Sequence, residues 1–244
     1  MNIDTIFDFE DKNVAESFIF DQRVVNVFDD MVSRSVPGYS TIQLLAADLA
    51  IRFSREGWIY DLGCSTGNTI KALLQRAVTP LKIVGIDNSQ DMLEQTRLNL
   101  ENKLGEHRIE LIAKDINDSE VYIHGKPDVV IMNLVLQFTR PLLRRTIIKT
   151  VFDNLNSGGC LILVEKIIHE DRLINKLFID YYYAFKKDMG YTELEISQKR
   201  EALENRLIPF YTGENMQILS DAGFGHVATF FQWMNFVGFL AIKD

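Results

Sequence analysis

The sequence predicts a doubly wound α/β fold built on a mostly parallel sheet. Between about residues 58 and 166, apolar runs of strand length alternate with segments of helical periodicity. The first run ends in a glycine-punctuated turn at residues 63–67, and the second ends in the acid Asp87. In such a sheet these two features form a nucleoside pocket at the strand ends. The glycine turn lets the backbone approach the ligand, and the carboxylate accepts the ribose hydroxyls.

Composition indicates one domain over residues 1–244. A chain of 244 residues, 47% hydrophobic and with only five prolines, can bury one sizeable core and shows no linker. No apolar run approaches the roughly 20 residues of a membrane span, and the acidic N-terminus lacks a signal-peptide plan. Cys64 and Cys160 adjoin apolar runs, so we expect buried, reduced thiols and a cytoplasmic protein without membrane contact. The net charge of −8 argues against direct nucleic-acid binding.

The elements follow in a regular order. An N-terminal helical cap (1–56), with helices from about residue 20, precedes the sheet, and Ser40 with Gln43 suggests a capping box there. Ser89 or Asn88 caps a later helix. A helical insertion (167–210) follows the fifth strand, with a second capping box at Thr192 and Glu195. The predicted strands are 58–62, 82–87, 109–113, 128–133 and 160–166, with helices at 68–76, 90–104, 141–155 and 214–221.

Two further strands, 226–233 and 236–242, close the chain. Only two residues separate them, which is too few for a parallel crossover, so they form an antiparallel hairpin at the sheet edge. Five parallel strands and this hairpin make the seven-stranded layout of the class I S-adenosylmethionine (SAM) methyltransferase fold.

SAM fits the glycine turn better than a phosphate-bearing nucleotide does. The spacing is D-x-G-x-x-x-G, no G-K-[ST] triplet is present, and no cation in the turn would hold a pyrophosphate. We expect Gly63, Cys64 and Ser65 to offer backbone to the methionine part. Asp87 binds the ribose diol, although an acid at a helix N-terminus is a common structural alternative.

The ends of the third and fourth strands complete the predicted pocket. Asp115 is expected to accept a hydrogen bond from the adenine amino group while the Ile116 amide contacts the ring. Asn133 ends the fourth strand, where a substrate or the cofactor tail must lie. A turn-capping role is the alternative for Asn133. The four histidines show no metal-ligand spacing, so no metal is predicted.

Two segments outside the sheet are unusually specific: Ser35-Val36-Pro37-Gly38-Tyr39 and Glu193-Leu194-Glu195-Ile196-Ser197-Gln198-Lys199-Arg200. With Tyr60-Asp61-Leu62-Gly63-Cys64-Ser65, Leu136-Gln137-Phe138 and Glu165-Lys166, they resemble the carboxy-S-adenosyl-L-methionine synthase family over nearly the whole chain. The resemblance implies that the chain does not methylate. It implies instead that SAM and prephenate become carboxy-SAM, phenylpyruvate and water, and that the product serves a separate enzyme of tRNA wobble-uridine carboxymethylation.

The same resemblance implies site residues. By matching motifs, the SAM site is lined by Tyr39, Gly63, Cys64, Ser65, Asp87, Asn88, Asp115, Ile116, Asn133 and Arg200. Tyr39 and Arg200 are the residues assigned to the reaction. Arg200 grips the new carboxylate, a role that suits a permanently charged guanidinium, and in relatives it reaches the site from the partner of a homodimer.

Several alternatives stay open. Lys199 and Arg200 also fit an exposed helix face that pairs with Glu195 or Glu204. Arg34 either meets prephenate or forms a surface salt bridge. The aromatic residues 181–183 and Phe185 are interpreted as core and interface residues, with a ring-stacking site as the alternative. The alternative functions are methyl transfer from SAM to a small molecule and non-catalytic SAM binding in a partner subunit.

Overall fold

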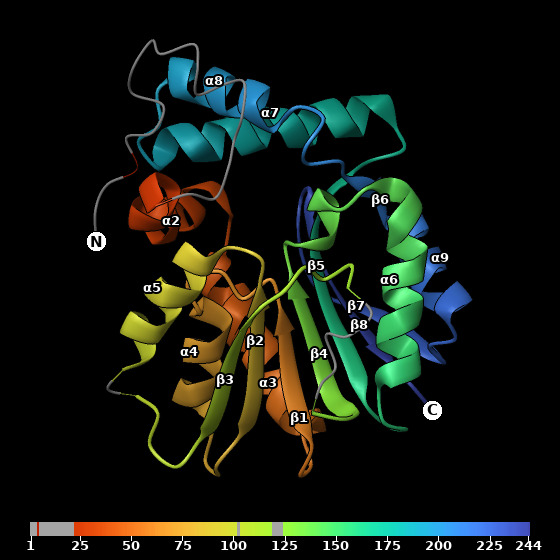
Figure 1. The fold of residues 1–244 in the computed structure, drawn as a ribbon. Coiled ribbons are helices and arrows are strands. Elements are labelled where there is room, and N and C mark those ends of the chain that lie inside the picture. The colour runs from red at the N-terminus through yellow and green to blue at the C-terminus, as the bar shows by residue number, and fades with distance from the viewer. Residues whose placement is uncertain (1–3, 5–21, 102, 119–123) are drawn as a thin grey trace.

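The computed structural model describes residue 4 and residues 22–101, 103–118 and 124–244. In this part of the chain one sheet has the strand order β3-β2-β1-β4-β5-β8-β7 (Figure 1). The strands on this path are β1 Trp58–Leu62, β2 Lys82–Asp87, β3 Arg108–Ala113, β4 Pro127–Asn133, β5 Cys160–Ile168, β7 His226–Trp233 and β8 Phe236–Ile242. A two-residue strand, β6 Phe210–Tyr211, pairs parallel with the end of β5.

The first five strands are parallel, and β1 lies between β2 and β4. The order in which strands are added to the sheet therefore reverses at β1. The glycine turn lies at this topological switch point, where ligands of such sheets bind. At the other edge β8 pairs antiparallel with both β5 and β7. The β7–β8 connection has a positive φ of 42° at Met234, which a two-residue hairpin turn requires.

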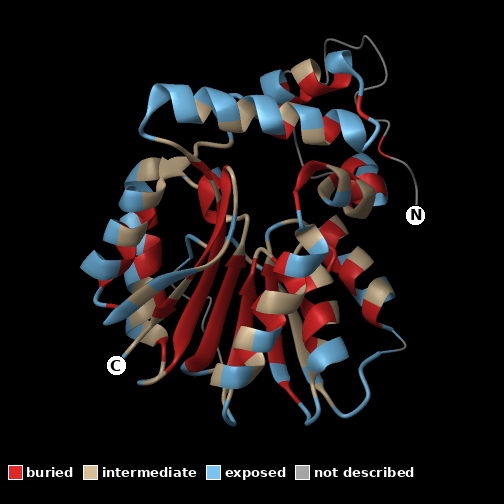
Figure 2. Cartoon of the chain, turned by 180° about the vertical axis from the view of Figure 1, so that it is seen from behind, coloured by how far each residue is buried: buried red, intermediate tan, exposed pale blue. Residues whose placement is uncertain are grey.

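The core has two apolar layers, one on each face of the sheet. Along β1, Ile59 faces the layer with α3 Tyr39–Phe53, α4 Asn68–Arg76 and α5 Gln90–Leu100, whereas Tyr60 faces the layer with α6 Pro141–Asn154 and α9 Thr212–Ala222. All five residues of β1 are buried, as expected for a strand covered on both sides. Figure 2 shows the central strands as the buried interior of the molecule.

The remaining helices lie over the carboxyl ends of the parallel strands. Helices α7 Arg172–Asp188 and α8 Glu193–Leu203 cross this edge, and α2 Gln22–Ser35 lies beside them (Figure 1). Together we call these three helices the cap. Only Tyr182 and Lys186 of α7 are buried, so most of this helix faces outward (Figure 2).

The predicted fold class is confirmed, with differences in local detail. All seven predicted strands are present, and β6 is an addition that its two-residue length hid from the sequence pattern. The expected helix 90–104 ends at Leu100. The capping box at Ser40 is wrong, because the N-cap of helix α3 is Gly38, two residues earlier, in the left-handed region (φ 68°). Of the predicted N-terminal helical segment (1–56), residues 1–3 and 5–21 lie outside the described residues.

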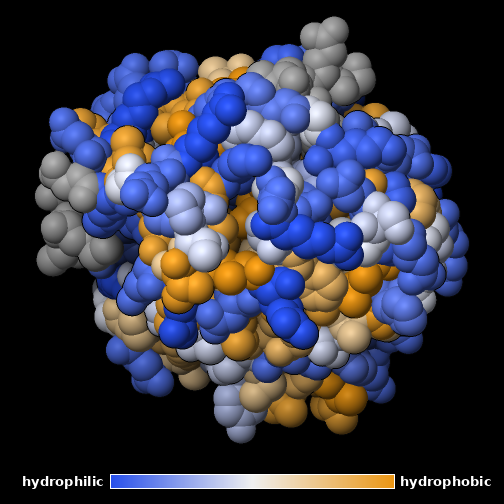
Figure 3. All heavy atoms as spheres, turned by 90° about the horizontal axis from the view of Figure 1, so that it is seen from below, coloured by the Kyte–Doolittle hydropathy of each residue, from blue (hydrophilic) through white to orange (hydrophobic). Residues whose placement is uncertain are grey.

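The opposite end of the strands carries a mixed surface. Figure 3 shows hydrophilic residues over most of this face and hydrophobic residues near its centre. None of the helices in the described part of the chain combines the length and the apolar character that a membrane crossing needs.

Candidate functional site

The turn between β1 and α4 is held by backbone geometry that requires glycine. Gly63 has a φ of 80°, and a Cβ there would lie 2.4 Å from a methyl of Val135. The amides of Gly63 and Cys64 both donate to the carbonyl of Ile86, at 2.7 and 2.9 Å. Ser65 also has a positive φ, 48°, which is uncommon for a non-glycine residue. The turn is therefore strained and fixed, as functional backbone often is.

Asp87 is oriented by this turn. Its two carboxylate oxygens accept from the amides of Ser65 and Ser89, each at 2.9 Å. Partial burial raises the pKa of Asp87, and the backbone donors oppose that shift. Each carboxylate oxygen can accept a second hydrogen bond. The side chain is therefore placed to accept from a diol.

Residues at the ends of β3 and β4 complete this side of the site. Asp115 Oδ1 accepts from the amide of Asn117 at 2.8 Å, so a local turn fixes the carboxylate. Both polar atoms of the Asn133 side chain are buried without a hydrogen-bond partner in the described part of the chain. A buried amide without partners costs free energy unless a ligand satisfies it.

The loop after β4 is held by β5. Leu134 has a φ of 62°, and the following 3-10 turn, η1 Leu136–Phe138, lies against Glu165. The Leu136 amide donates to the Glu165 carboxylate at 3.0 Å, and the Gln137 side chain accepts from the Lys166 amide at 2.8 Å. Desolvation raises the pKa of Glu165 to about 8, and Arg144 opposes the shift. These contacts hold the cavity wall in place.

One cavity of about 750 Å³ lies between the strand ends and the cap. All ten residues predicted for the SAM site line it: Tyr39, Gly63, Cys64, Ser65, Asp87, Asn88, Asp115, Ile116, Asn133 and Arg200. The structure therefore brings together residues that are as far apart as 161 positions in the sequence, from Tyr39 to Arg200. Their binding roles remain predictions.

Tyr39 lies where the cap meets the glycine turn. Its hydroxyl accepts from the side-chain amide of Asn68 at 3.4 Å, and the same Nδ2 atom donates to Asp29 of α2 at 2.7 Å. Thr66 donates to the same Asp29 oxygen at 2.5 Å. Burial raises the pKa of Tyr39 to about 12, so its hydroxyl stays protonated and can donate to a ligand.

Arg200 comes from helix α8, whose capping box at Thr192 and Glu195 is present as predicted. Its side chain is 62% exposed, and among the described residues it forms one ion pair, a long 4.0 Å contact with Glu201. Arg200 thus lines the cavity without a tight ion pair to a described carboxylate.

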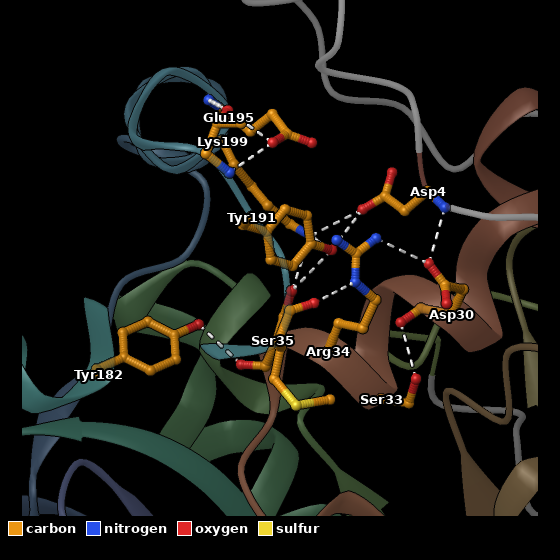
Figure 4. A network of polar contacts seen from close by, with 11 residues as sticks. Asp4, Asp30, Ser33, Arg34, Ser35, Tyr182, Tyr191, Glu195 and Lys199 are labelled. Atoms are coloured by element: carbon orange, nitrogen blue, oxygen red, sulfur yellow. Dashed lines mark hydrogen bonds and ion pairs between the residues drawn. The ribbon is translucent and has the colours of Figure 1, made fainter. Parts of the chain in front are cut away.

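The structure decides between the two alternatives for Arg34. Its guanidinium pairs with Asp30 at 3.1 Å, lies over the Tyr191 ring at 4.1 Å and donates to the Met189 carbonyl at 2.9 Å (Figure 4). Arg34 is not among the cavity-lining residues. It joins α2 to the end of α7, so it has a structural role.

The sequence patterns missed a group of cavity lysines. Lys166, Lys186 and Lys199 line the cavity together with Tyr182 and Tyr183. Lys199 is 4% exposed, and the interpretation of it as part of an exposed helix face is therefore wrong. Two signals in the sequence were available. Lys166 is the last residue of the predicted strand 160–166, and Lys186 follows Tyr182 by four residues on an amphipathic helix.

Both cysteines are buried and unpaired, as expected, and burial raises the pKa of each thiol. Among the described residues no group of three His, Cys, Asp or Glu side chains is arranged to hold a metal ion.

Comparison with known proteins agrees with this geometry. Residues 59–159 match the family model described as a methyltransferase domain. The chain is 45% identical over 237 residues to the carboxy-S-adenosyl-L-methionine synthase of Methylococcus capsulatus, covering 96% of this chain and 97% of that protein.

Solved structures with low sequence identity share the fold. An O-methyltransferase family protein from Burkholderia thailandensis is 19% identical, with a TM-score of 0.70 over 92% of this chain and 60% of that chain. Human N-acetylserotonin methyltransferase, solved with SAM, is 17% identical, with a TM-score of 0.62 over 91% of this chain and 55% of that chain.

Proposed function

Because the chain belongs to the carboxy-S-adenosyl-L-methionine synthase family, we propose that this enzyme converts SAM and prephenate to carboxy-SAM, phenylpyruvate and water. The methyl group of SAM loses a proton and gains the carboxyl group that leaves prephenate. The hydroxide lost from prephenate and the methyl proton together make the water, so atoms and charges balance. Carboxy-SAM would then supply tRNA wobble-uridine carboxymethylation by a separate enzyme, and we propose that the present chain acts in the cytoplasm.

The SAM site in this proposal is the glycine-turn side of the cavity. Asp87 accepts the ribose hydroxyls, and Asp115 with the Ile116 amide recognises adenine. Gly63, Cys64 and Ser65 face the methionine part, with Asn88 beside the ribose. The unsatisfied Asn133 amide supports a polar ligand at this point, because a bound molecule would supply the hydrogen bonds it lacks.

The observation that carries the proposal is the position of Arg200. Arg200 lines the same cavity as the residues proposed for adenosine. A plain methyl donor needs no cation near its sulfonium, since like charges repel. Carboxy-SAM carries a new carboxylate next to the sulfonium, and a guanidinium can bind it in a bidentate, permanently charged arrangement. We propose that Arg200 and the protonated Tyr39 hydroxyl hold this carboxylate.

Product analysis tests the proposal. Purified protein is incubated with SAM and prephenate, and the products are identified by mass spectrometry. We expect a sulfonium species heavier than SAM by one carboxyl group in place of a hydrogen, formed only when prephenate is present. Folded protein that forms no such product would contradict the proposal.

Methyl transfer to a small molecule is the alternative, because solved structures of methyltransferases share the fold. It predicts that S-adenosylhomocysteine accumulates with an acceptor and that prephenate is not needed. The same mass spectra therefore separate the two reactions.

We also propose that the enzyme acts as a homodimer formed through α7. Leu173, Leu177 and Tyr181 follow one another at four-residue spacing on this helix and are 77%, 49% and 53% exposed. An exposed apolar stripe of this kind is typical of a helix that packs against a second helix. A second copy of the chain is the occupant that the family resemblance implies.

A further inference from the structure

Three lysines from three elements meet at one side of the cavity. Lys166 lies near the carboxyl end of β5, Lys186 lies on the inner face of α7, and Lys199 lies on α8. Lys186 and Lys199 are 5% and 4% exposed. Lysine is among the residues least often buried in proteins, so this group requires an explanation.

Two of the ammonium groups share one tyrosine ring. The Lys166 and Lys186 nitrogens lie 4.7 and 4.6 Å from the centre of the Tyr182 ring. The ring itself is fixed, because the Tyr182 hydroxyl donates to the Ser35 carbonyl at 2.9 Å (Figure 4). No side-chain hydrogen bond or ion pair joins Lys166 or Lys186 to another residue in the described part of the chain. The ring face offsets only part of the cost of burying two cations.

Lys199 is different, because it has partners. Its nitrogen donates to the Ser35 hydroxyl at 2.9 Å and the Tyr191 hydroxyl at 3.2 Å, and it lies 3.4 Å from Asp4 (Figure 4). Lys199 therefore shapes this end of the cavity. Asp4 lies beside Lys199, and its negative charge opposes the lowering of the pKa of Lys186.

The acids proposed for adenosine lie at other strand ends than Lys166. Asp87 and Asp115 lie at the ends of β2 and β3, while Lys166 lies at the end of β5. Strands β2 and β5 are separated by β1 and β4, and neighbouring strands are 4.7–4.9 Å apart, so the two sides lie about 14 Å from each other. The acidic side suits the adenosine of SAM, and the ammonium groups repel its sulfonium. The unpaired lysines therefore fit an anion on a second molecule.

We propose that Lys166 and Lys186 form a carboxylate subsite for the second substrate, a dicarboxylate, and hold the carboxylate that this substrate retains in the product. This inference rests on the proposed function and assigns contacts to its carboxyl donor. A cation on the carboxyl group that leaves would stabilise the ground state more than the transition state, because that charge is dispersed as the carbon–carbon bond breaks. We therefore assign the two lysines to the carboxylate that does not react.

The burial of both lysines supports this assignment. Desolvation lowers the pKa of Lys166 to about 8, and desolvation with repulsion from Lys199 and Lys166 lowers that of Lys186 to about 7. The charged and titratable groups around them are Tyr182, Tyr183, Lys199 and Asp4. A bound carboxylate favours the protonated lysines, so it would stabilise charges that the empty cavity disfavours.

Isosteric variants test the subsite. Lys166→Met and Lys186→Met keep most of the side-chain volume and remove the charge, and Lys176→Met, an exposed position on α7 outside the cavity, is the matched control. Binding of prephenate and of phenylpyruvate is measured by calorimetry on protein loaded with S-adenosylhomocysteine, and SAM binding on protein without it. Thermal unfolding checks the fold of each variant.

We expect each cavity variant to weaken prephenate and phenylpyruvate binding by about tenfold or more. SAM affinity should stay within about twofold, and the control should match the parent chain. Unchanged prephenate affinity in folded variants would overturn the subsite. A matching loss of SAM affinity would also overturn it, because the lysines would then hold the methionine carboxylate.

This test is independent of turnover. If the parent chain binds the dicarboxylate through these lysines but forms no carboxy-SAM, the proposed function fails and the subsite stands. If carboxy-SAM forms and the variants keep their affinity for prephenate, only the subsite fails.

Discussion

Arg200 lines the cavity, and a guanidinium is a permanently charged group. Within the described part of the chain its one ion pair is the exposed 4.0 Å contact with Glu201, so its charge remains available to a ligand. In the proposed function this residue distinguishes carboxy-SAM from SAM, because only carboxy-SAM has a carboxylate on the reacting carbon.

Arg200→Ala should therefore act on one ligand and spare the other. We expect carboxy-SAM binding to weaken by about 1.5–3 kcal/mol, the range for a charged hydrogen bond, while SAM binding stays nearly intact. Titration calorimetry with both ligands measures the difference. Arg145→Ala, which removes an exposed arginine paired with Asp221, is the control. Equal losses for SAM and carboxy-SAM would count against the assigned role.

Asp61, buried under the glycine turn, predicts a pH effect on stability. Its Oδ2 has no partner among the described residues, and desolvation with the nearby Asp87 raises its pKa to about 8. The folded chain thus binds a proton between pH 3.8 and about 8 that the unfolded chain releases. Stability from this group is complete at low pH and is lost as pH rises through the folded pKa.

Asp61→Asn should remove that loss. We expect the stability of the variant relative to the parent chain to rise by roughly 1–3 kcal/mol from pH 4 to pH 8, because over this range the unfolded parent chain ionises Asp61 while the folded chain keeps it protonated. Urea unfolding at the two pH values, without ligand, measures the effect. A variant that is equally destabilised at both would mean that the carboxylate serves packing alone.

At the scale of elements, the turn between β1 and α4 joins the sheet to the cap. Asp29 of α2 accepts from Thr66 and Asn68, so the cap is fastened to the same turn that is proposed to meet the methionine part. A change of backbone at Gly63 should therefore affect both the fold and the binding of SAM.

Gly63→Ala tests this coupling against a matched glycine. The new Cβ would meet two Val135 methyls at 2.4 and 2.9 Å and would sit at a φ of 80°, so we expect a loss of several kcal/mol in stability and of measurable SAM binding. Gly125 has a similar φ, 92°, with nothing within 4 Å of its Cβ position. Gly125→Ala should cost about 1 kcal/mol and leave SAM binding unchanged. Similar effects of both substitutions would show that the Val135 contact is unimportant.

The same elements show what could be predicted from sequence. Strands β1, β2, β4 and β5 are apolar runs that end in glycine or polar residues, so periodicity located them within a few residues. The start of α3 was misplaced because a left-handed glycine, not a side-chain cap, opens that helix. The two-residue β6 carries too few residues for any periodic signal.

The site was predictable where it depends on strand ends. Gly63, Asp87, Asp115 and Asn133 each lie at or just after the carboxyl end of a strand, and parallel strands bring these ends together. Lys166 and Lys186 were not predictable as a pair, because their meeting depends on how α7 crosses the sheet. No periodicity within either segment encodes that crossing.

At the scale of the whole molecule, the outward face of α7 predicts assembly. Leu177→Glu places a charge in the exposed stripe of Leu173, Leu177 and Tyr181. We expect sedimentation to show a dimer for the parent chain and a larger monomer fraction for the variant. Lys176→Glu adds a negative charge beside the stripe and should stay dimeric. A parent chain that sediments as a monomer at all concentrations would contradict the proposed dimer.

The cavity between sheet and cap links a nucleoside site, a guanidinium and a lysine pair in one space. This arrangement suits a reaction with a sulfonium and a second, anionic substrate. It is the central claim of the proposed function that a carboxyl group passes from that anion to the methyl carbon.

The most direct test follows that carboxyl group. Prephenate with an isotopic label in its ring carboxyl carbon is incubated with SAM and the purified protein, and the sulfonium products are analysed by mass spectrometry. The account predicts that the label appears in carboxy-SAM and that phenylpyruvate is unlabelled. Label that stays out of every sulfonium species, with S-adenosylhomocysteine as the SAM-derived product, would contradict it.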